Sequence, residues 1–262
     1  MGSATTQALA TTTAELSAAT VSDLSVARGL FAAAREIADS AQLSGALSAW
    51  GAPGEARAQV ARTVFAGYGP TVVQLLASAV AVRWSSTEDL VSGIEELAIR
   101  AAAIGAPGTD VEGELFQVAR TVAANPELEL ALGSRLGDAS AKGALVEKLL
   151  GGRAGEATTL IASQLVQQPR ERRVRSLLQR ALQLVADQRG KKVATVRVAG
   201  ALDSAQQDRL AAALRSRYGA DVTLNVVVDP QVLGGMRVEI GDDVIDGTVS
   251  SRINDLRQRL AG

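Results

Sequence analysis

The chain carries few of the side chains that perform covalent or metal chemistry in proteins. Among its 262 residues there is no histidine and no cysteine. A Ser-His-Asp or Cys-His catalytic site is therefore excluded, and so is a zinc site with histidine or cysteine ligands. Without cysteine no disulfide can form, which fits a reducing compartment. The sequence predicts neither a catalytic centre nor a metal site, and it predicts no cofactor.

Three short motifs invite a chemical interpretation, and each has a simpler one. Gly234-Gly235 is not followed by Lys-Ser or Lys-Thr at the spacing of a phosphate-binding loop, so turn geometry is the preferred interpretation. Asp242-Asp243 and Glu95-Glu96 lack the oxygen-ligand spacing of a calcium loop. We expect both acidic pairs to be solvated charges.

A basic run near the middle of the chain is the strongest charge feature. Its cations are Arg170, Arg172, Arg173, Arg175, Arg180, Arg189, Lys191 and Lys192, with only Glu171 and Asp187 as counter-charges. No aromatic residue is interleaved, which argues against stacking of single-stranded nucleic acid. The net charge of −1 gives the whole chain no electrostatic attraction to nucleic acid. A solvated helix face is the preferred interpretation, contact with an acidic protein partner comes second, and nucleic acid third.

The elements that must position any functional surface repeat along the chain at an offset of 85 residues. Leu30-Phe31 returns as Leu115-Phe116, and Arg57 returns as Lys142. Apolar residues at helical spacing, separated by proline and glycine, predict short helices in each copy. We interpret the pattern as an internal duplication that produces two tandem helical bundles.

The first copy is expected to form helices at 5–18, 24–38, 43–50, 55–66, 70–83 and 88–103, and the second at 111–124, from 126, at 140–150, 157–166 and 174–189. Thr109 to Glu112 has the pattern of a capping box. The helix at 88–103 is expected to close the first bundle and open the second. Trp50 and Trp84 lie near helix ends, where each is either an anchor for a partner or partly buried core.

The C-terminal part has different punctuation. Strands are expected at 192–198, 222–228 and 236–240, with helices from Asp203 or Ser204 to Tyr218 and from Thr248 to Leu260. This order predicts a small α+β domain of strand–helix–strand–strand–helix type. The expected fold is therefore mainly α with a small α+β C-terminal domain. Its domains are a first bundle at 1–105, a second bundle at 106–190 and the α/β domain at 191–262.

Targeting signals are not apparent in the sequence. No apolar run approaches the roughly 18 residues that a membrane span requires. The first residues lack the basic flank and apolar run of a signal peptide. We expect a cytoplasmic protein with no direct membrane span, whose association with a membrane would come from its partners.

The strand–turn–strand segment near the C-terminus resembles one protein family. Its characteristic residues are Asp229, Pro230, Gly234, Gly235, Gly241, Asp246, Gly247 and Arg252. At this spacing they are similar to the signature of the delta subunit of F-type ATP synthases, a family that includes the mitochondrial oligomycin-sensitivity-conferring protein. The resemblance extends over 110–262, whereas the first copy is absent from the common short form. A doubled bundle resembles the longer actinobacterial version.

The resemblance implies a structural subunit with no catalytic activity of its own. Its bundle would grip the N-terminal helices of alpha subunits, and its C-terminal domain would hold the end of the b-type stalk. The family acts as a stator during proton-driven ATP synthesis, as a peripheral part of the complex at the cytoplasmic face of the plasma membrane. The second copy is expected to keep this ordinary role, with the first copy extending the stalk contact.

Three other functions remain as alternatives. The first is a free-standing helical adaptor that binds amphipathic helices, because a bundle of short helices leaves grooves of the right shape. The second is a nucleic-acid-binding protein that uses the basic run, which would show steep salt dependence. An enzyme is the weakest alternative, since no paired catalytic groups stand in a recognisable motif.

Overall fold

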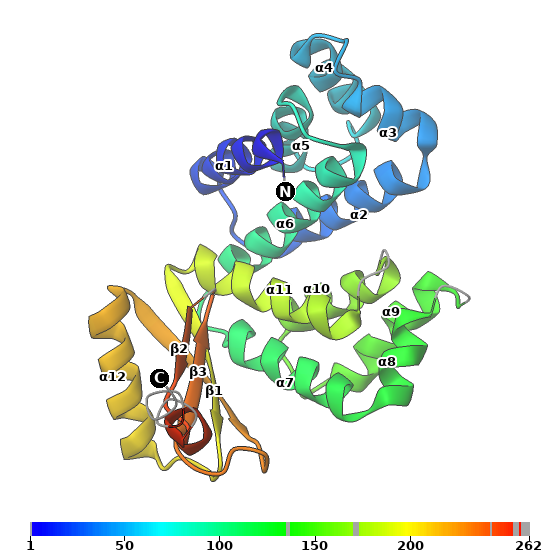
Figure 1. Ribbon diagram of the computed structural model, residues 1–262. Coiled ribbons are helices and arrows are strands. Elements are labelled where there is room, and N and C mark those ends of the chain that lie inside the picture. Colours follow the sequence, from blue (N-terminus) through cyan, green and yellow to red (C-terminus); the bar gives the residue numbers. More distant parts are fainter. Residues whose placement is uncertain (1, 135–136, 170–172, 242, 254–256, 258–262) are drawn as a thin grey trace. The chain divides into compact units, whose positions relative to one another are not determined.

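The computed structural model describes residues 2–134, 137–169, 173–241, 243–253 and 257 (Figure 1). The chain divides into two compact units, Met1–Val185 and Ala186–Gly262. In the described part of the first unit every regular element is a helix. The second unit contains a four-stranded sheet and the helix that connects two of its strands. The predicted fold class, mainly α with a small α+β part at the C-terminus, is confirmed.

The helices reproduce the repeat that the sequence predicts. They are α1 (Ser3–Ala18), α2 (Ser25–Asp39), α3 (Ala41–Ser48), α4 (Gly54–Val64), α5 (Pro70–Ala81), α6 (Thr87–Gly105), α7 (Val111–Ala124), α8 (Pro126–Gly133), α9 (Ala139–Leu150), α10 (Glu156–Gln167) and α11 (Val174–Gln188). The bounds of α3 and α8 differ by 85 at both ends, and every other pair from α1/α6 to α6/α11 agrees with that offset within two residues. Helix α6 therefore has two places in the repeat. It ends the first copy, as α11 ends the second, and it begins the second copy, as α1 begins the first.

The same positions form the core in both copies. Leu30 and Leu115 are both fully buried, and so are Leu76 and Ile161. Alanine fills many of the other core positions, such as Ala27, Ala61 and Ala162, and its small side chain allows helix axes to approach closely. The burial pattern supports the duplication independently of the helix bounds.

Helix α6 is interior, whereas α1 is not. Along α6 the buried residues surround the helix, because it packs against α2 and α5 of the first copy and against α10 of the second. Helix α1 packs against α5 and α6 and buries only one stripe, made of Thr5, Ala8, Thr12 and Leu16. Among the described residues, no helix covers the outer face of α1 as α2 and α10 cover α6.

One helix start differs from its prediction. The N-cap of α7 is Asp110, whose side chain accepts a hydrogen bond from the Gly113 N–H at 3.1 Å. The expected capping box from Thr109 to Glu112 was therefore wrong: the cap lies one residue later, and Gly113 at its third position has no side chain to complete a box. Glu112 is fully buried, and a carboxylate inside the bundle is not free to return to the cap.

The second unit is a mixed sheet with one crossover. Its elements are β1 (Lys191–Val198), α12 (Ser204–Tyr218), β2 (Asp221–Val228), β3 (Met236–Ile240) and β4 (Asp243–Asp246), and the strand order is β2-β1-β3-β4. Strand β2 runs parallel to β1 after the α12 crossover, while β3 and β4 pair in antiparallel fashion. Helix α12 begins at a capping box formed by Asp203 and Gln206.

The sequence prediction of three strands was incomplete. Asp243–Asp246 forms a fourth strand where turn residues were expected, because a short edge strand with two aspartates carries too little alternation to be recognised. Residues 249–253 and 257 are helical, in agreement with the expected last helix, and 254–256 and 258–262 lie outside the described residues.

One face of the sheet forms the core of the second unit. Ala194, Val196 and Val198 of β1 and Val238 and Ile240 of β3 pack with Leu214 of α12 in a single cluster. Figure 1 shows α12 lying along this side of the strands. The other face carries charged residues such as Arg197, Arg237 and Glu239. The sheet therefore has one apolar and one polar face, as antiparallel and mixed sheets of this size usually do.

Candidate docking surfaces

The signature glycines hold two turns of the second unit together. Gly234 and Gly235 have φ of 149° and 78°, and a Cβ added to Gly235 would overlap the carbonyl oxygen of Gly247. The Gly247 N–H donates to the Met236 carbonyl at 2.9 Å, and the Val249 N–H donates to the Gly234 carbonyl at 3.1 Å. Only glycine allows this approach and this backbone. The two joined turns determine where the last helix begins.

The Asp229-Pro230 pair ends β2. The Asp229 N–H donates to the Val198 carbonyl at 2.8 Å, and its carboxylate accepts a hydrogen bond from the Gln231 N–H at 2.9 Å. The same carboxylate lies 3.9 Å from the guanidinium of Arg197. Pro230 stands in the following turn, where the chain needs no further ladder N–H. Both residues shape the loop that leads to the glycine pair.

The N-cap of the last helix is Thr248, whose hydroxyl oxygen accepts a hydrogen bond from the Ser251 N–H at 3.2 Å, and this threonine is held in turn by Asp246. The Asp246 Oδ1 accepts hydrogen bonds from the hydroxyl of Thr248 at 2.7 Å and from the Thr248 N–H at 3.0 Å, and this bonding holds the pKa of Asp246 below its usual value. Gly241, with φ of 57°, lies in the β3–β4 turn at the other end of the hairpin. Arg252 is exposed, and its N–H donates to the Thr248 carbonyl at 3.2 Å. The signature thus converges on one pair of turns, and Gly241 and Arg252 lie outside it.

Apolar side chains are exposed beside these turns. Leu233, Val249 and Ile253 are 78%, 43% and 45% exposed. We call these three residues the C-terminal patch. Leu233 stands in a turn, and Val249 and Ile253 stand four residues apart at the start of the last helix; exposed apolar side chains of this kind are a candidate interaction surface.

The first unit has a hollow between α1 and the end of α5. Its volume is about 410 Å³, and its lining is Ser3, Ala4, Gln7, Ala8, Thr11, Val82 and Arg83. Trp50 is 76% exposed, and the Arg83 guanidinium lies 5.1 Å from the centre of its ring. Trp84, in contrast, is buried, and its indole N–H donates to the Ala79 carbonyl at 2.7 Å. Of the two tryptophans singled out from the sequence, Trp50 remains available to a partner and Trp84 is core.

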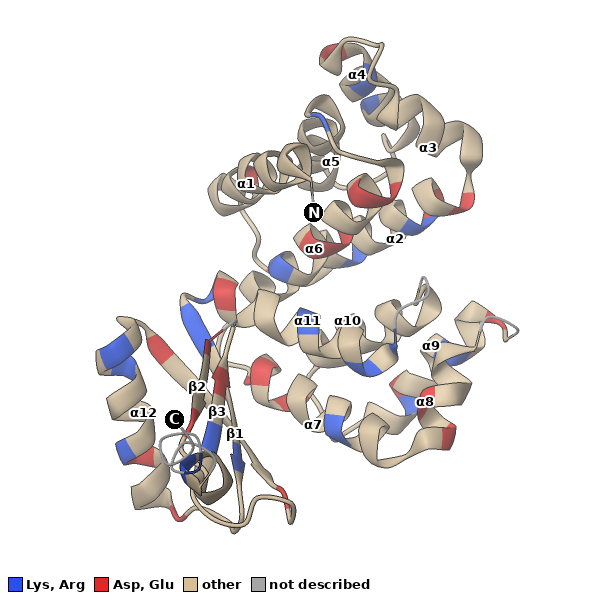
Figure 2. Ribbon diagram, in the orientation of Figure 1, with Lys and Arg blue, Asp and Glu red and all other residues tan. Residues whose placement is uncertain are grey.

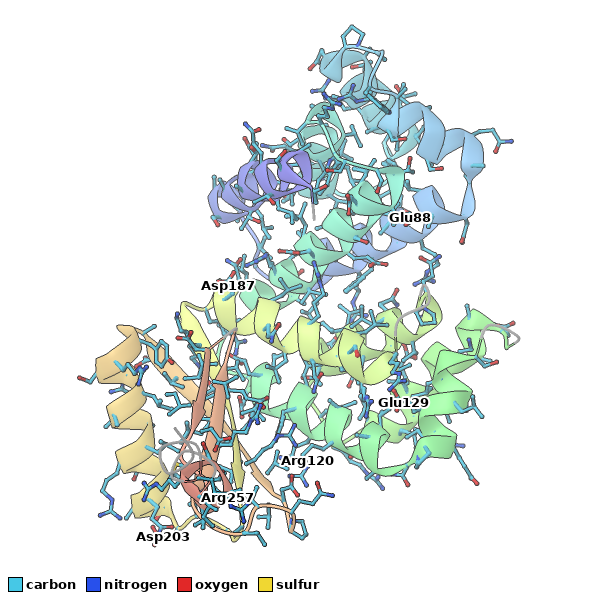
Figure 3. All side chains as sticks on the ribbon, in the orientation of Figure 1. Glu88, Arg120, Glu129, Asp187, Asp203 and Arg257 are labelled. Atoms are coloured by element: carbon cyan, nitrogen blue, oxygen red, sulfur yellow. The ribbon has the colours of Figure 1, made fainter. Side chains whose placement is uncertain are left out.

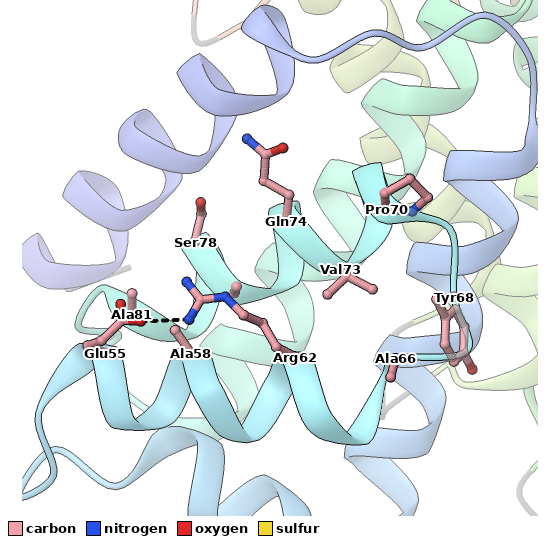
Figure 4. Close-up of a pocket in the computed structure, with 11 residues that line it drawn as sticks. Glu55, Ala58, Arg62, Ala66, Tyr68, Pro70, Val73, Gln74, Ser78 and Ala81 are labelled. Atoms are coloured by element: carbon pink, nitrogen blue, oxygen red, sulfur yellow. Dashed lines mark hydrogen bonds and ion pairs between the residues drawn. The ribbon is translucent and has the colours of Figure 1, made fainter.

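A second hollow lies between α4 and α5 (Figure 4). Its volume is about 620 Å³, and small apolar side chains such as Ala58 and Ala77 line it. At its edge the Arg62 guanidinium pairs with the Glu55 carboxylate at 2.6 Å.

In the second copy the equivalent of the α1/α5 pair is covered by the chain itself. Helices α6 and α10 correspond to α1 and α5, and α2 packs on α6 and reaches α10 through polar side chains. Its contacts are Arg28 with Glu156, Arg35 with Gln164, and Asp39 with Gln168, the last at 3.0 Å. Gln168 corresponds to Arg83 at the 85-residue offset. The α1/α5 pair has no such cover among the described residues.

Two buried cations occupy equivalent positions in the two copies. The Arg57 guanidinium donates to the carbonyls of Ala49, Ala52, Val80, Ala81 and Val82 at 2.6–3.3 Å. The Lys142 ammonium donates to the Ser134 carbonyl, which corresponds to that of Ala49. The internal repeat pairs Arg57 with Lys142 in the sequence, but it does not predict a role for either cation. The sequence signal that could have predicted the buried role is a basic residue that recurs at the same repeat position, on an otherwise apolar helix face.

The expected exposure of Glu95-Glu96 was wrong for Glu96. Its side chain is buried, with one carboxylate oxygen 2.9 Å from the Arg100 guanidinium and the other 3.1 Å from that of Arg180. Because α6 is interior, a helix position that would face solvent in a single bundle faces α11 here. Asp243 of the other acidic pair is exposed as expected, and Asp242 lies outside the described residues.

The basic run is partly neutralised. Arg180 pairs with Glu96, and Arg175 lies 3.7 Å from the carboxylate of Glu129, which Figure 3 labels. Arg170 and Arg172 lie outside the described residues. In Figure 2 the ribbon positions of basic and acidic residues are interspersed over the described elements. The charge distribution gives little support to the nucleic-acid alternative.

The described ranges contain neither a metal-binding cluster nor a helix that could span a membrane. No cluster of acidic side chains in these ranges has the make-up of a metal site. Nor does any helix in them combine the length and apolar character needed to cross a bilayer.

Comparison with known proteins identifies the family. The family described as ATP synthase delta (OSCP) subunit matches residues 98–260. The ATP synthase subunit delta of Leifsonia xyli subsp. xyli is 48% identical over 264 residues, which is 100% of both chains. The chain belongs to the ATP synthase delta (OSCP) subunit family. The resemblance inferred from the signature residues is thereby confirmed, and the chain is a structural subunit of ATP synthase.

Other delta subunits and one solved structure are more distant. The subunit delta of Nocardia farcinica is 40% identical over 237 residues, covering 88% of each chain, and that of Streptomyces avermitilis is 42% identical over 212 residues, covering 79% and 78%. A chain of the Toxoplasma gondii mitochondrial ATP synthase hexamer aligns with a TM-score of 0.40 and 19% identity, over 64% of this chain and 97% of that one. The family match begins within α6, so it omits most of the first bundle, which the Leifsonia delta subunit shares.

Proposed function

We propose that the chain is the stator clamp of an F-type ATP synthase. In this role it ties the catalytic head, through N-terminal helices of alpha subunits, to the membrane-anchored b-type stalk while the central shaft turns. It acts as a peripheral subunit at the cytoplasmic face of the plasma membrane and makes or breaks no bond. The observation that carries the proposal is the presence of separate docking surfaces on the two units of a delta-family chain.

The stalk end is assigned to the C-terminal patch. Leu233, Val249 and Ile253 are aliphatic, exposed and held by a backbone that the signature glycines make rigid. A helix from the stalk would bury these side chains, at roughly 25 cal/mol for each Å² of apolar surface removed from water. A clamp under torque requires such a preorganised surface, since a loose loop would yield before it transmitted force.

The head end is assigned to the first bundle. The sequence favoured the second bundle, but α2 covers the α6/α10 pair there, and an incoming helix would have to displace it. The corresponding α1/α5 pair keeps its hollow, with Arg83 at the position where Gln168 meets Asp39 of α2. A helix that docks beside α1 can therefore place a carboxylate near Arg83, in the helix-in-groove mode.

Single cysteines test both assignments, because the natural chain has none. Gln7→Cys reports on the α1/α5 hollow, Leu233→Cys on the C-terminal patch, and Leu130→Cys on an exposed site of the second bundle. With a short bifunctional reagent in intact ATP synthase, Gln7→Cys should cross-link to an alpha N-terminus and Leu233→Cys to the stalk. An alpha adduct from Leu130→Cys alone would move the head contact to the second bundle. Absence of both expected adducts, or a chain that purifies without the rotary enzyme, would favour a free-standing adaptor.

A further inference from the structure

Three side-chain contacts join helix α2 of the first copy to helix α10 of the second. We call this line of contacts the α2/α10 seam; its pairs are Arg28 with Glu156, Arg35 with Gln164, and Asp39 with Gln168. The contacts advance together along both sequences, so the two helices run in the same direction beside each other. Every contact is made by polar side-chain atoms, and none of the six residues is buried.

The seam residues are specific to their copies. At the 85-residue offset five of the six meet a different residue type, namely Gly113 for Arg28, Ala124 for Asp39, Thr71 for Glu156, Ala79 for Gln164 and Arg83 for Gln168. Core positions of the same helices recur, as Leu30 does in Leu115. The seam is therefore not a remnant of the repeated unit, and its residues suit the one place where the two copies face each other.

The seam is the third side of a triangle of helices whose other two sides are apolar. Helix α2, in which Leu30 and Ile37 are fully buried, packs along α6, and α6 packs on α10. Burial of apolar surface is the dominant attraction in a folded chain, so these two sides stay closed. A rotation about α6 separates α2 from α10 by breaking the polar contacts of the seam.

Both helices of the seam are fixed within their own bundles. Helix α10 packs on α9, and the Glu114 carboxylate of α7 accepts hydrogen bonds from the Gly155 N–H at 2.9 Å and from the Thr158 hydroxyl. These bonds hold the N-terminal end of α10, where donors lack partners within the helix. The seam therefore lies between two well-packed bodies and opens as a whole.

Solvent reaches the seam. The side chains of Arg28 and Glu156 are 51% and 74% exposed. A hollow of about 430 Å³ lies beside this pair, and Asp23, Gly105 and Thr109 help to line it. Exposed ion pairs are weak, because water screens the charges and ordering the side chains costs entropy. Contacts of this kind favour the closed arrangement without making it permanent.

We propose that the α2/α10 seam is a polar latch between the two bundles, which opens by rotation of the first bundle about α6 and closes again. The open arrangement is then a minor state of about 0.1–10% of the molecules. Packed helices move as rigid bodies in such hinge and shear motions. In a stator the latch lets the first bundle tilt while the second keeps its orientation; this use rests on the proposed function, whereas the latch is a property of the chain itself.

Distances between the bundles test the latch. Ala46→Cys on α3 and Ala131→Cys on α8 are exposed positions that correspond at the 85-residue offset, and both can carry a nitroxide label because the natural chain has no cysteine. Pulsed electron paramagnetic resonance on the isolated full chain should show one dominant distance. Arg28→Glu places two carboxylates at the first contact, so the ratio of a second distance to the first should rise about ten-fold.

A charge swap shows whether the pair itself holds the seam. Arg28→Glu with Glu156→Arg restores opposite charges and should restore the parent distance. Arg62→Glu is the matched control, because Arg62 is an exposed arginine that pairs with Glu55 within α4, and it should leave the distance unchanged. Circular dichroism establishes that each variant is folded.

The other end of the seam gives an independent variant. Asp39→Lys with Gln168→Lys places like charges at the third contact and should produce the same second distance as Arg28→Glu. Unchanged distances in the folded variants at both ends would overturn the latch, and so would a swapped pair that keeps the second distance or a control that acquires it. Because the distances are measured in the isolated chain, these results leave the stator proposal standing, and the cross-links from Gln7→Cys and Leu233→Cys decide that proposal separately.

Discussion

The buried cation of the first bundle offers the sharpest test of how these bundles hold together. The Arg57 guanidinium joins the α3–α4 connection to the C-terminal end of α5, because it donates to five carbonyls at 2.6–3.3 Å. The last carbonyls of a helix have no partner within the helix. Replacement by methionine keeps the length of the side chain but removes every donor.

The cost follows from the carbonyls that lose their partner. Water can reach some of them, since only the bond to the Val80 carbonyl is fully buried. With about two carbonyls left unsatisfied at about 1–3 kcal/mol each, Arg57→Met should lower the free energy of unfolding by about 2–6 kcal/mol. Arg57→Lys should cost less, about 1–2 kcal/mol, because an ammonium group retains three donors. Lys142 shows that an ammonium group is accepted at the equivalent position.

Urea unfolding provides the measurement. In a Trp50→Phe background, Trp84 becomes the single tryptophan and reports on the core of the first bundle. Arg62→Met is the matched control on the same helix; its exposed pair with Glu55 should be worth less than about 1 kcal/mol. If Arg57→Met loses no more stability than Arg62→Met, the carbonyl-bridging role of Arg57 is refuted.

Three further predictions concern other parts of the chain. Gly235→Ala should destabilise the second unit by about 3 kcal/mol or more, because a Cβ there would overlap the Gly247 carbonyl in addition to the strain of a positive φ. Gly241→Ala, at a positive φ in open space, should cost about 1–2 kcal/mol. Equal losses of protection from hydrogen exchange in β1 of the two variants would contradict this. Thr248→Val should raise the pKa of Asp246 in a carboxyl NMR titration. Because the pKa of Asp246 is depressed in the folded chain, its contribution to stability is present above the unfolded value and is lost as pH falls through the folded value. The variant should therefore lose less stability than the parent on acidification, and an unchanged titration would count against the Thr248–Asp246 hydrogen bonds. Glu96→Gln should lower the free energy of unfolding by about 2–4 kcal/mol in urea titration, because it removes a buried carboxylate shared by two guanidinium groups. A change below about 0.5 kcal/mol would mean that this cluster is not important for stability.

The sequence predicted most elements of the fold because their signals are local. Helix bounds follow from apolar spacing together with stops such as Pro70, Pro126 and Gly151, and these stops lie where the helices begin or end. The fourth strand was missed because Asp243–Asp246 is stable only as a partner of β3, and pairing across a hairpin leaves little trace in four residues. The displaced cap of α7 shows the same limit on a smaller scale.

The docking surfaces were less predictable than the elements that carry them. The signature residues were identified, but the contact that unites Gly235 with Gly247 depends on how two turns meet. The alternatives for Trp50 and Trp84 stayed open because both stand near helix ends, and only packing separates an exposed ring from a buried one. The exposed residues Val60 and Val64 of α4 and Leu145 and Leu149 of α9 could not be told from core positions, since both kinds are aliphatic and stand at helical spacing.

The sequence by itself determined the helices, the 85-residue repeat and the family, because spacing, caps and turn residues are properties of neighbouring positions. Tertiary structure alone decided which faces those helices bury. Helix α6 is interior because two bundles share it, and this sharing turns Glu96 inward and places α2 over the α6/α10 pair. The physical reason is that burial depends on contacts between segments far apart in the chain, and a periodic pattern does not specify its partner.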